Sequence, residues 1–213
     1  MEKFFSKIRP LAAFIGLGLL GLHLILELVY EIGYGVGAVE IICWIIGLLL
    51  AGVLVVAYFL KKEELFKVTL GLLLAFYGVG VALHGLSMLG ATGGTGELVF
   101  FILCLICAVA ALALFLLRVA FPAIFDKPLF KLIMLALIAS VVLFGFIGSI
   151  FIFVEAGQTY ADGLKAYNQC KKNGYDGCGY YLPKVWPVVI ATIDTCIVLP
   201  AAFLFGFFIH ESY

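Results

Sequence analysis

The sequence predicts an all-α integral membrane protein with six transmembrane helices, and three observations lead to this prediction. Apolar residues make up 65% of the 213 residues and charged residues only 12%, about half the charged fraction of a soluble domain. The apolar residues fall into blocks close to the ~20 residues that a helix needs to cross hydrocarbon. Charged, glycine-rich or proline-containing segments separate these blocks. A chain of this composition has no room for a sizeable soluble domain.

The first four spans follow from the apolar blocks and the signals between them. Pro10 suits the first turn of a helix, and the apolar run after it is too long for a cleaved secretory signal. Lys61 to Glu64 end the second span, and the glycine-rich turn 90–96 separates the third from the fourth. These signals place the first four spans at about 11–32, 38–60, 68–89 and 98–117.

Two further spans follow a proline-containing connection. Pro122 and Pro128 keep this connection from being helical throughout, and the fifth span is expected at about 132–154. Residues 156–185 form the only long polar segment, which we expect to be a loop. Pro187 then suits the start of a sixth span at about 187–209. The whole chain is a single transmembrane domain.

The positively charged residues predict the orientation of the chain, because Lys and Arg concentrate on the cytoplasmic side. If the N-terminus lies inside, nine of them fall on that side: Lys3, Lys7, Arg9, Lys61, Lys62, Lys67, Arg118, Lys127 and Lys131. The other side receives Lys165, Lys171, Lys172 and Lys184, all in the long loop. Both termini are therefore expected in the cytoplasm and the 156–185 loop outside, with the plasma membrane as the expected location.

A shift of 57 residues relates the first two pairs of spans. It aligns Gly33 and Glu40, which flank the first outer turn, with Gly90 and Glu97, which flank the second. We therefore interpret the chain as three helical hairpins. The first two are a parallel repeat, and the third carries the outer loop.

Four ionisable residues inside the spans form the candidate site: His23, Glu27, His84 and Asp194. Glu27 and His84 each lie six residues before a glycine that opens an outer turn, and Asp194 lies seven residues after Pro187. At ~1.5 Å per residue they lie roughly 9–10 Å below the outer surface, with His23 one turn deeper. Together they can bind a divalent metal, relay protons or line a cavity open to the outside. In the alternative, each forms its own hydrogen bond to a neighbouring helix.

Glu40 and Glu97 are weaker candidates. Each opens a helix after a glycine-rich turn, where a carboxylate interacts favourably with the positive end of the helix dipole. A cation-attracting mouth is the functional alternative.

The cysteines predict one disulfide and leave one redox motif. Cys170 and Cys178 flank a short polar stretch of the outer loop, and we expect them to form a disulfide in an oxidising compartment. Cys104 and Cys107 have Cys-x-x-Cys spacing inside the fourth span.

The order of this motif, a further helix and a loop with two cysteines is similar to the four-helix layout of the bacterial quinone-linked disulfide-forming membrane enzymes. The resemblance covers residues 68–213 and implies that Cys104 and Cys107 exchange electrons with a quinone. The family's arginine after the motif is absent here, where residues 108–113 read Ala-Val-Ala-Ala-Leu-Ala.

Three functions therefore remain open. The first is a transporter, channel or carrier subunit with an outward-facing polar site for an ion or small solute, with a divalent metal among the ions considered. The second is a non-catalytic accessory subunit of a larger membrane complex, or a homo-oligomer, that uses the outer loop as a contact. The third is the thiol oxidoreductase, and only this function requires a quinone. Between an enzyme and a protein without enzymatic activity, we favour the latter. The lipid bilayer is the expected partner and nucleic acid is not, because no basic stretch can follow a phosphate backbone.

Overall fold

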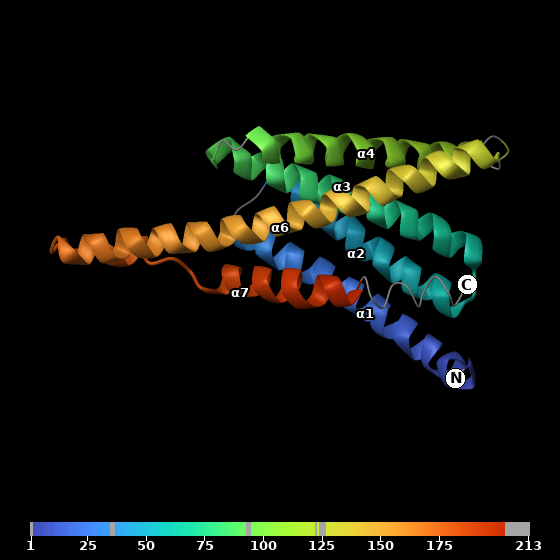
Figure 1. The fold of residues 1–213 in the computed structure, drawn as a ribbon, viewed down its shortest axis with the longest axis horizontal. Coiled ribbons are helices and arrows are strands. Elements are labelled where there is room, and N and C mark those ends of the chain that lie inside the picture. Colours follow the sequence, from blue (N-terminus) through green and yellow to red (C-terminus); the bar gives the residue numbers. More distant parts are fainter. Residues whose placement is uncertain (1, 35–36, 93–94, 122, 124–126, 203–213) are drawn as a thin grey trace.

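The protein is a multi-pass integral membrane protein. Its computed structural model describes residues 2–34, 37–92, 95–121, 123 and 127–202 (Figure 1). Six helices in these residues are long and apolar enough to cross a bilayer. Every regular element of the described chain is helical. These features agree with the all-α fold class expected from composition.

The first four helices match the first four predicted spans. They are α1 (Glu2–Tyr34), α2 (Ala38–Phe59), α3 (Glu63–Thr92) and α4 (Thr95–Ala120). Helices α1, α3 and α4 extend beyond both predicted ends, whereas α2 ends one residue early. Pro10 lies inside α1 rather than in its first turn, so the prediction that this proline opens the helix is wrong. Helical geometry continues on the polar side of the proline, where hydropathy carries no signal.

Helix α6 (Pro128–Lys172) corrects the predicted outer loop. It is a single helix of 45 residues, roughly 67 Å long at 1.5 Å per residue, about twice the thickness of the hydrocarbon core. Residues 156–172, which were expected in a loop, are therefore helical. Their polarity marks where the chain leaves the apolar region. The helix continues because no proline interrupts it and because its polar part consists largely of residues compatible with helix. Figure 1 shows α6 extending past the other helices.

The chain returns from the end of α6 through a short connection. The 3-10 helix η1 (Cys178–Tyr181) is followed by α7 (Trp186–Ile193), with Pro187 near its start as predicted. Asp194–Val198, labelled η2, is a π-helix that continues α7. Residues 203–209 of the predicted sixth span lie outside the described chain.

The helices pack so that the first and the last are neighbours. Helix α3 contacts α2, α4 and α6, while α1 contacts α2 on one side and α7 with η2 on the other. Glycines let aromatic rings approach the backbone, since a Cβ at Gly80 would lie 3.1 Å from Trp44 and a Cβ at Gly85 would overlap Phe101. This is the small-residue packing typical of membrane helices.

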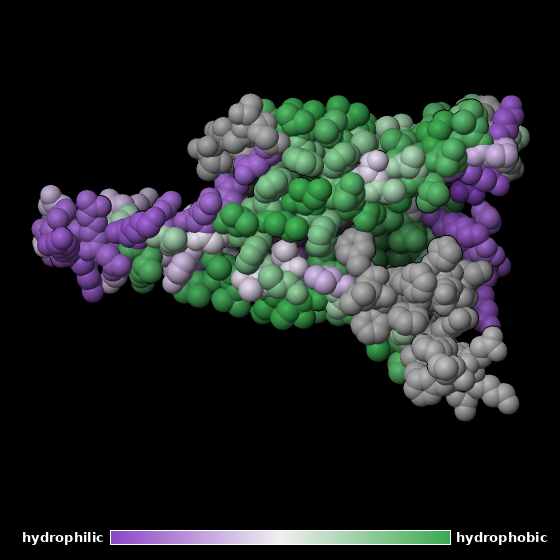
Figure 2. Space-filling model, in the orientation of Figure 1, coloured by the Kyte–Doolittle hydropathy of each residue, from purple (hydrophilic) through white to green (hydrophobic). Residues whose placement is uncertain are grey.

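The surface of the bundle matches a bilayer environment. Figure 2 shows apolar residues over its middle and hydrophilic residues at the projecting end of α6 and at the opposite edge. Large apolar side chains such as Leu49, Ile106 and Leu135 are more than half exposed. Exposed side chains of this kind suit contact with lipid tails.

Candidate functional site

A buried contact between the first and the last helices forms the centre of the candidate site. The Nδ1 atom of His23 lies 2.9 Å from Oδ1 and 2.8 Å from Oδ2 of Asp194. His23 comes from α1, and Asp194 is the first residue of η2. Their exposed fractions are only 1% and 3%, so the contact is shielded from both solvent and lipid.

Glu27 completes a group of three. It follows His23 by four residues, so both side chains project from the same face of α1. One donor atom each of His23, Glu27 and Asp194 lies within 4.8 Å of the others. An imidazole nitrogen and two carboxylates at this separation have the chemistry of a metal-ligand set. The same groups can also hold and pass a proton.

The π-helix places Asp194 at an irregular point in the sixth span. A π-helical turn is wider than an α-helical turn and is found mostly as a single turn, often at functional sites. Here it begins at Asp194 and ends at Val198. The regular helical pattern of α7 therefore stops at the residue that contacts His23.

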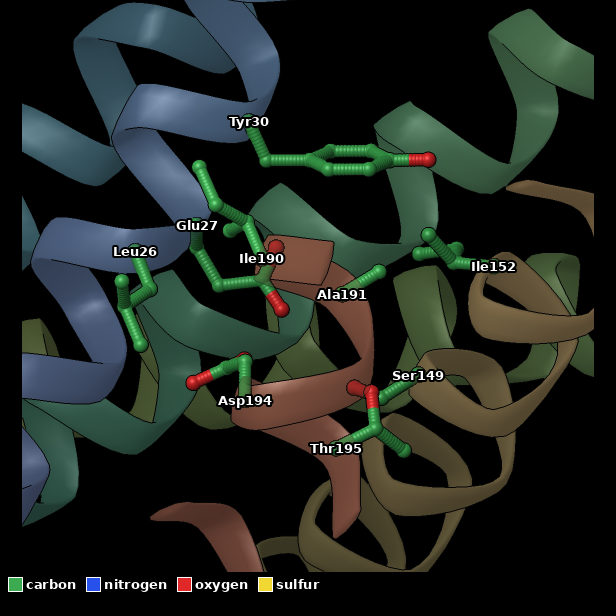
Figure 3. A pocket seen from close by; sticks show the side chains of 9 residues that line it. All are labelled: Leu26, Glu27, Tyr30, Ser149, Ile152, Ile190, Ala191, Asp194 and Thr195. Atoms are coloured by element: carbon green, nitrogen blue, oxygen red, sulfur yellow. The ribbon is translucent and has the colours of Figure 1, made fainter. Parts of the chain in front are cut away.

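A small cavity adjoins the cluster on the side of Glu27 and Asp194. Its lining comes from α1, α6, α7 and η2 (Figure 3): Leu26, Glu27, Tyr30, Ser149, Ile152, Ile190, Ala191, Asp194 and Thr195. It has room for about one water molecule or one cation. Two carboxylates and two aliphatic hydroxyls therefore share one small space.

Sequence reasoning missed two of the polar residues around the cluster. The Ser149 hydroxyl lies 3.0 Å from that of Tyr77 and donates to the Gly145 carbonyl at 3.1 Å. The Tyr77 ring in turn lies 5.3 Å from the His23 ring between centroids. Tyr77 on α3 therefore contacts both His23 of the cluster and Ser149 on α6, which lines the cavity. Hydroxyl groups in predicted spans were the available signal, but Ser and Tyr are too common there to single these two out.

His84 is buried like the cluster residues but lies outside the cluster. Its side chain is 0% exposed, and its ring packs edge-on against Tyr30 with 5.7 Å between centroids. His84 does not line the cavity, whereas Tyr30 does. Of the four residues predicted to lie at similar depth, the structure therefore brings only three into one cluster. Three form the cluster, and the fourth contacts the cavity wall through an aromatic ring.

Glu40 and Glu97 are placed at helix starts, and neither lines the cavity described above. Glu40 is buried, and its carboxylate folds back against Gly37, the residue that precedes α2. Glu97 lies in the first turn of α4 and is half-buried. These positions suit the stabilising interaction of a carboxylate with a helix N-terminus. The alternative of a cation-attracting mouth stays a prediction.

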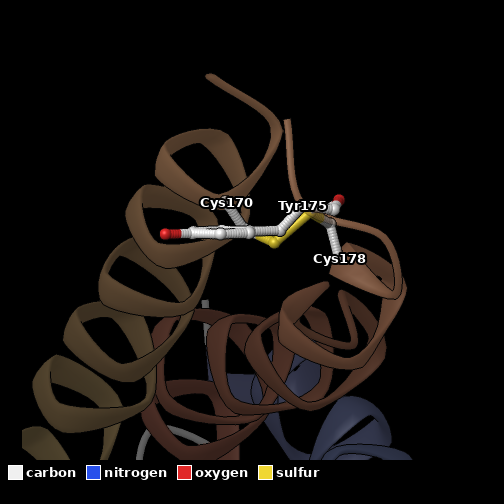
Figure 4. The surroundings of a disulfide bond; sticks show 3 residues. All are labelled: Cys170, Tyr175 and Cys178. Carbon is white, nitrogen blue, oxygen red and sulfur yellow. Dashed lines mark hydrogen bonds between the residues drawn. A yellow bond between two sulfur atoms is a disulfide. The ribbon is translucent and has the colours of Figure 1, made fainter. Parts of the chain in front are cut away.

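The structure brings the predicted pair, Cys170 and Cys178, to disulfide distance. Their Cα atoms lie 5.7 Å apart, and the bridge joins the end of α6 to the start of η1 (Figure 4). The other candidate pair, Cys104 and Cys107, consists of free thiols. The Cys104 thiol is fully buried and donates to the Gly78 carbonyl at 3.5 Å.

Comparisons with protein-family models, with curated proteins and with solved structures found no match to this chain.

Proposed function

We propose that the protein is a small cation carrier, or the transport subunit of one, and that His23, Glu27 and Asp194 form its intramembrane binding site. The observation that carries this proposal is that these three side chains form one buried cluster, beside a cavity that Glu27 and Asp194 line. Each is at least 93% buried, in a place where ionisable groups are costly and usually serve an ion or proton pathway. A cation is the natural ligand because two of the three groups are carboxylates.

The site is proposed to open to the outside. The distribution of Lys and Arg supports cytoplasmic termini, which places the connection after α6 outside. Helices α1 and α7 meet at that end, where the Trp186 indole packs so closely on Gly33 that a Cβ on Gly33 would overlap it. We propose that α1 and α7 separate beside this contact to admit the ion from outside. The interpretation of the chain as three hairpins, the first two a parallel repeat, belongs to the same proposal.

The energy source is proposed to be a gradient or a partner chain, since the sequence contains no nucleotide-binding motif. The carrier therefore works passively, through ion coupling or with a partner subunit. The π-helix at Asp194 supports a functional role at this point, because single π-helical turns inside α-helices are frequent at functional sites. A small rearrangement there would change the distance between Asp194 and the pair on α1.

Flux measurements on proteoliposomes test the proposal. The purified chain is reconstituted, and the uptake of radioactive Na⁺, Rb⁺, Ca²⁺, Mn²⁺ and Zn²⁺ is compared with that of empty vesicles. We expect uptake of at least one cation, and at least about a tenfold loss of the rate in Glu27→Gln. Asp162→Asn is the matched control. It makes the same carboxylate-to-amide change on an exposed residue paired with Lys165 and should leave the rate unchanged. Equal rates in vesicles with the wild-type chain, with Glu27→Gln and with no protein would refute carriage at this site.

A second candidate function is that of an accessory subunit, and the extension of α6 favours it. This helix continues well past the apolar middle of the bundle and ends in the disulfide-bonded turn. Tyr175 and Tyr180 on this turn are 68% and 91% exposed, and exposed tyrosines are enriched at protein interfaces. Copurification from native membrane, followed by mass spectrometry, tests this function. A stoichiometric partner lost on truncation of residues 160–182 would support it.

A further inference from the structure

We propose that the ion bound at this site is a divalent first-row transition metal, such as Zn²⁺ or Co²⁺. Its ligands are Nδ1 of His23 and the carboxylates of Glu27 and Asp194, and one coordination position faces the cavity. This inference rests on the proposed function and narrows it from cations in general to one chemical class.

The donor set separates this class of ion from the others. Sodium, magnesium and calcium prefer sites made of oxygen donors, whereas an imidazole nitrogen suits zinc, copper, iron and nickel. Imidazole nitrogens and carboxylate oxygens are both zinc ligands, and catalytic zinc sites have three protein ligands and keep a further position open. His23 is the residue that decides the class, because the two carboxylates alone would accept either kind of ion.

The spacing of the donors fits one ion with small side-chain movements. Two ligand atoms bound to a zinc-like ion at ~2.0–2.2 Å lie about 3–4 Å apart, depending on the coordination angle. The His23 and Asp194 donors are already 2.8 and 2.9 Å apart, and the whole group spans no more than 4.8 Å. The donors of His23 and Asp194 are therefore slightly closer together than two ligands of one ion, while the widest separation allowed within the cluster is slightly larger. Binding one ion therefore requires His23 and Asp194 to move slightly apart and Glu27 to approach them.

Formal charge also matches a divalent ion. The two carboxylates contribute two negative charges when ionised, and the neutral imidazole contributes none. A divalent cation makes the complex neutral, which suits a buried place within a bilayer where net charge is costly.

The second nitrogen of His23 is compatible with this role. The Nε2 atom is buried and has no hydrogen-bond partner among the described residues. In the contact with an ionised Asp194, Nδ1 donates its proton to the carboxylate. A metal bound at Nδ1 would displace this proton, and the imidazole would then carry its proton on Nε2.

The adjoining cavity supplies independent support for a ligand. Glu27 and Asp194 line it, and about one water molecule fits inside. The Ser149 and Thr195 hydroxyls share this lining (Figure 3). A water bound to the metal can occupy the open position there and hydrogen-bond to either hydroxyl.

Visible spectroscopy with Co²⁺ tests the inference on the intact, tag-free protein in detergent. A Co²⁺ ion with four or five nitrogen and oxygen ligands absorbs visible light far more strongly than hexa-aqua Co²⁺. We expect intense bands that saturate at one Co²⁺ per chain and disappear when Zn²⁺ is added. Glu27→Gln should weaken Co²⁺ binding by at least about tenfold. Because it leaves the contact between His23 and Asp194 in place, this variant tests the site even if the histidine variants fold poorly.

The chain has three histidines, so three single variants can assign the imidazole ligand. His23→Gln should lose the intense bands, whereas His84→Gln and His210→Gln should keep them. Strong bands that persist in His23→Gln would overturn the inference, since the metal would then be bound elsewhere. Binding of Ca²⁺ or Na⁺ but not Co²⁺, lost in Glu27→Gln, would also overturn it and leave the cation carrier standing. A chain that binds none of these ions and transports none would overturn both proposals.

Discussion

The imidazole of His23 and the carboxylate of Asp194 meet across 171 positions of sequence, with Nδ1 2.8 Å from Oδ2. This contact joins α1 to η2, the first and the last helical elements of the described chain. Both groups are buried, and their mutual contact partly compensates for the cost of removing them from water. The same contact places two of the three donors of the proposed site. We therefore expect it to contribute to both stability and ion binding.

The stability contribution can be measured with a double-mutant cycle. Removing one partner of a buried pair leaves the other uncompensated, at a cost of about 3–5 kcal/mol in soluble proteins. We expect His23→Leu and Asp194→Leu each to lower the thermal midpoint in detergent by a similarly large amount. The double variant should be more stable than the sum of the two losses predicts. Strictly additive losses would show that the contact contributes no coupling energy.

Glycine substitutions test how α3 approaches α4. A Cβ at Gly85 would overlap the Phe101 ring, while a Cβ at Gly52 on α2 meets no atom within 4 Å. We expect Gly85→Ala to destabilise the protein by about 1–3 kcal/mol, the range seen for overpacked cores. Gly52→Ala is the matched control and should be neutral or stabilising by up to about 1 kcal/mol, because alanine favours helix. Thermal unfolding in the same detergent measures both. The opposite order of stabilities would contradict the packing described for α3.

The disulfide between Cys170 and Cys178 is expected to hold the end of α6 in place. Closing a loop of this size stabilises the folded state by about 2–3 kcal/mol, and here the effect should remain local. Replacing both cysteines with serine should therefore speed tryptic cleavage after Lys171 and Lys172, while the thermal midpoint of the bundle changes little. In the wild type, both cysteines should resist alkylation until a reductant is added. Free alkylation without reductant would refute the pairing in the native protein.

The orientation of the chain is testable by labelling. Lys165 and Glu63 have exposed side chains, with 78% and 52% of their surface accessible. An impermeant maleimide should label Lys165→Cys in intact cells and Glu63→Cys only after permeabilisation. The unmodified chain, which keeps four free cysteines in its described residues, measures the background. Labelling of Glu63→Cys in intact cells would invert the proposed topology.

Much of the candidate site was predictable because it depends on local spacing. The four-residue separation of His23 and Glu27 places both on one face of α1. The positions of Glu27, His84 and Asp194 within their spans predicted similar depths, since the rise of a helix is constant. Depth does not specify the direction of a side chain around the helix axis. His84 has the same predicted depth as the others, but it packs against Tyr30 instead of joining the cluster.

The sequence alone determined the membrane class, the number of spans and the cysteine pair of the disulfide, because apolar length and short separations along the chain constrain these features directly. The tertiary structure decided that α6 continues to Lys172, that Tyr77 contacts Ser149, and that Asp194 meets His23 rather than His84. The physical reason is that helix packing sets the rotation and crossing of each helix, through close contacts such as Phe101 on Gly85 and Trp186 on Gly33. These contacts join residues far apart in sequence, so the spacing within any one span does not contain them.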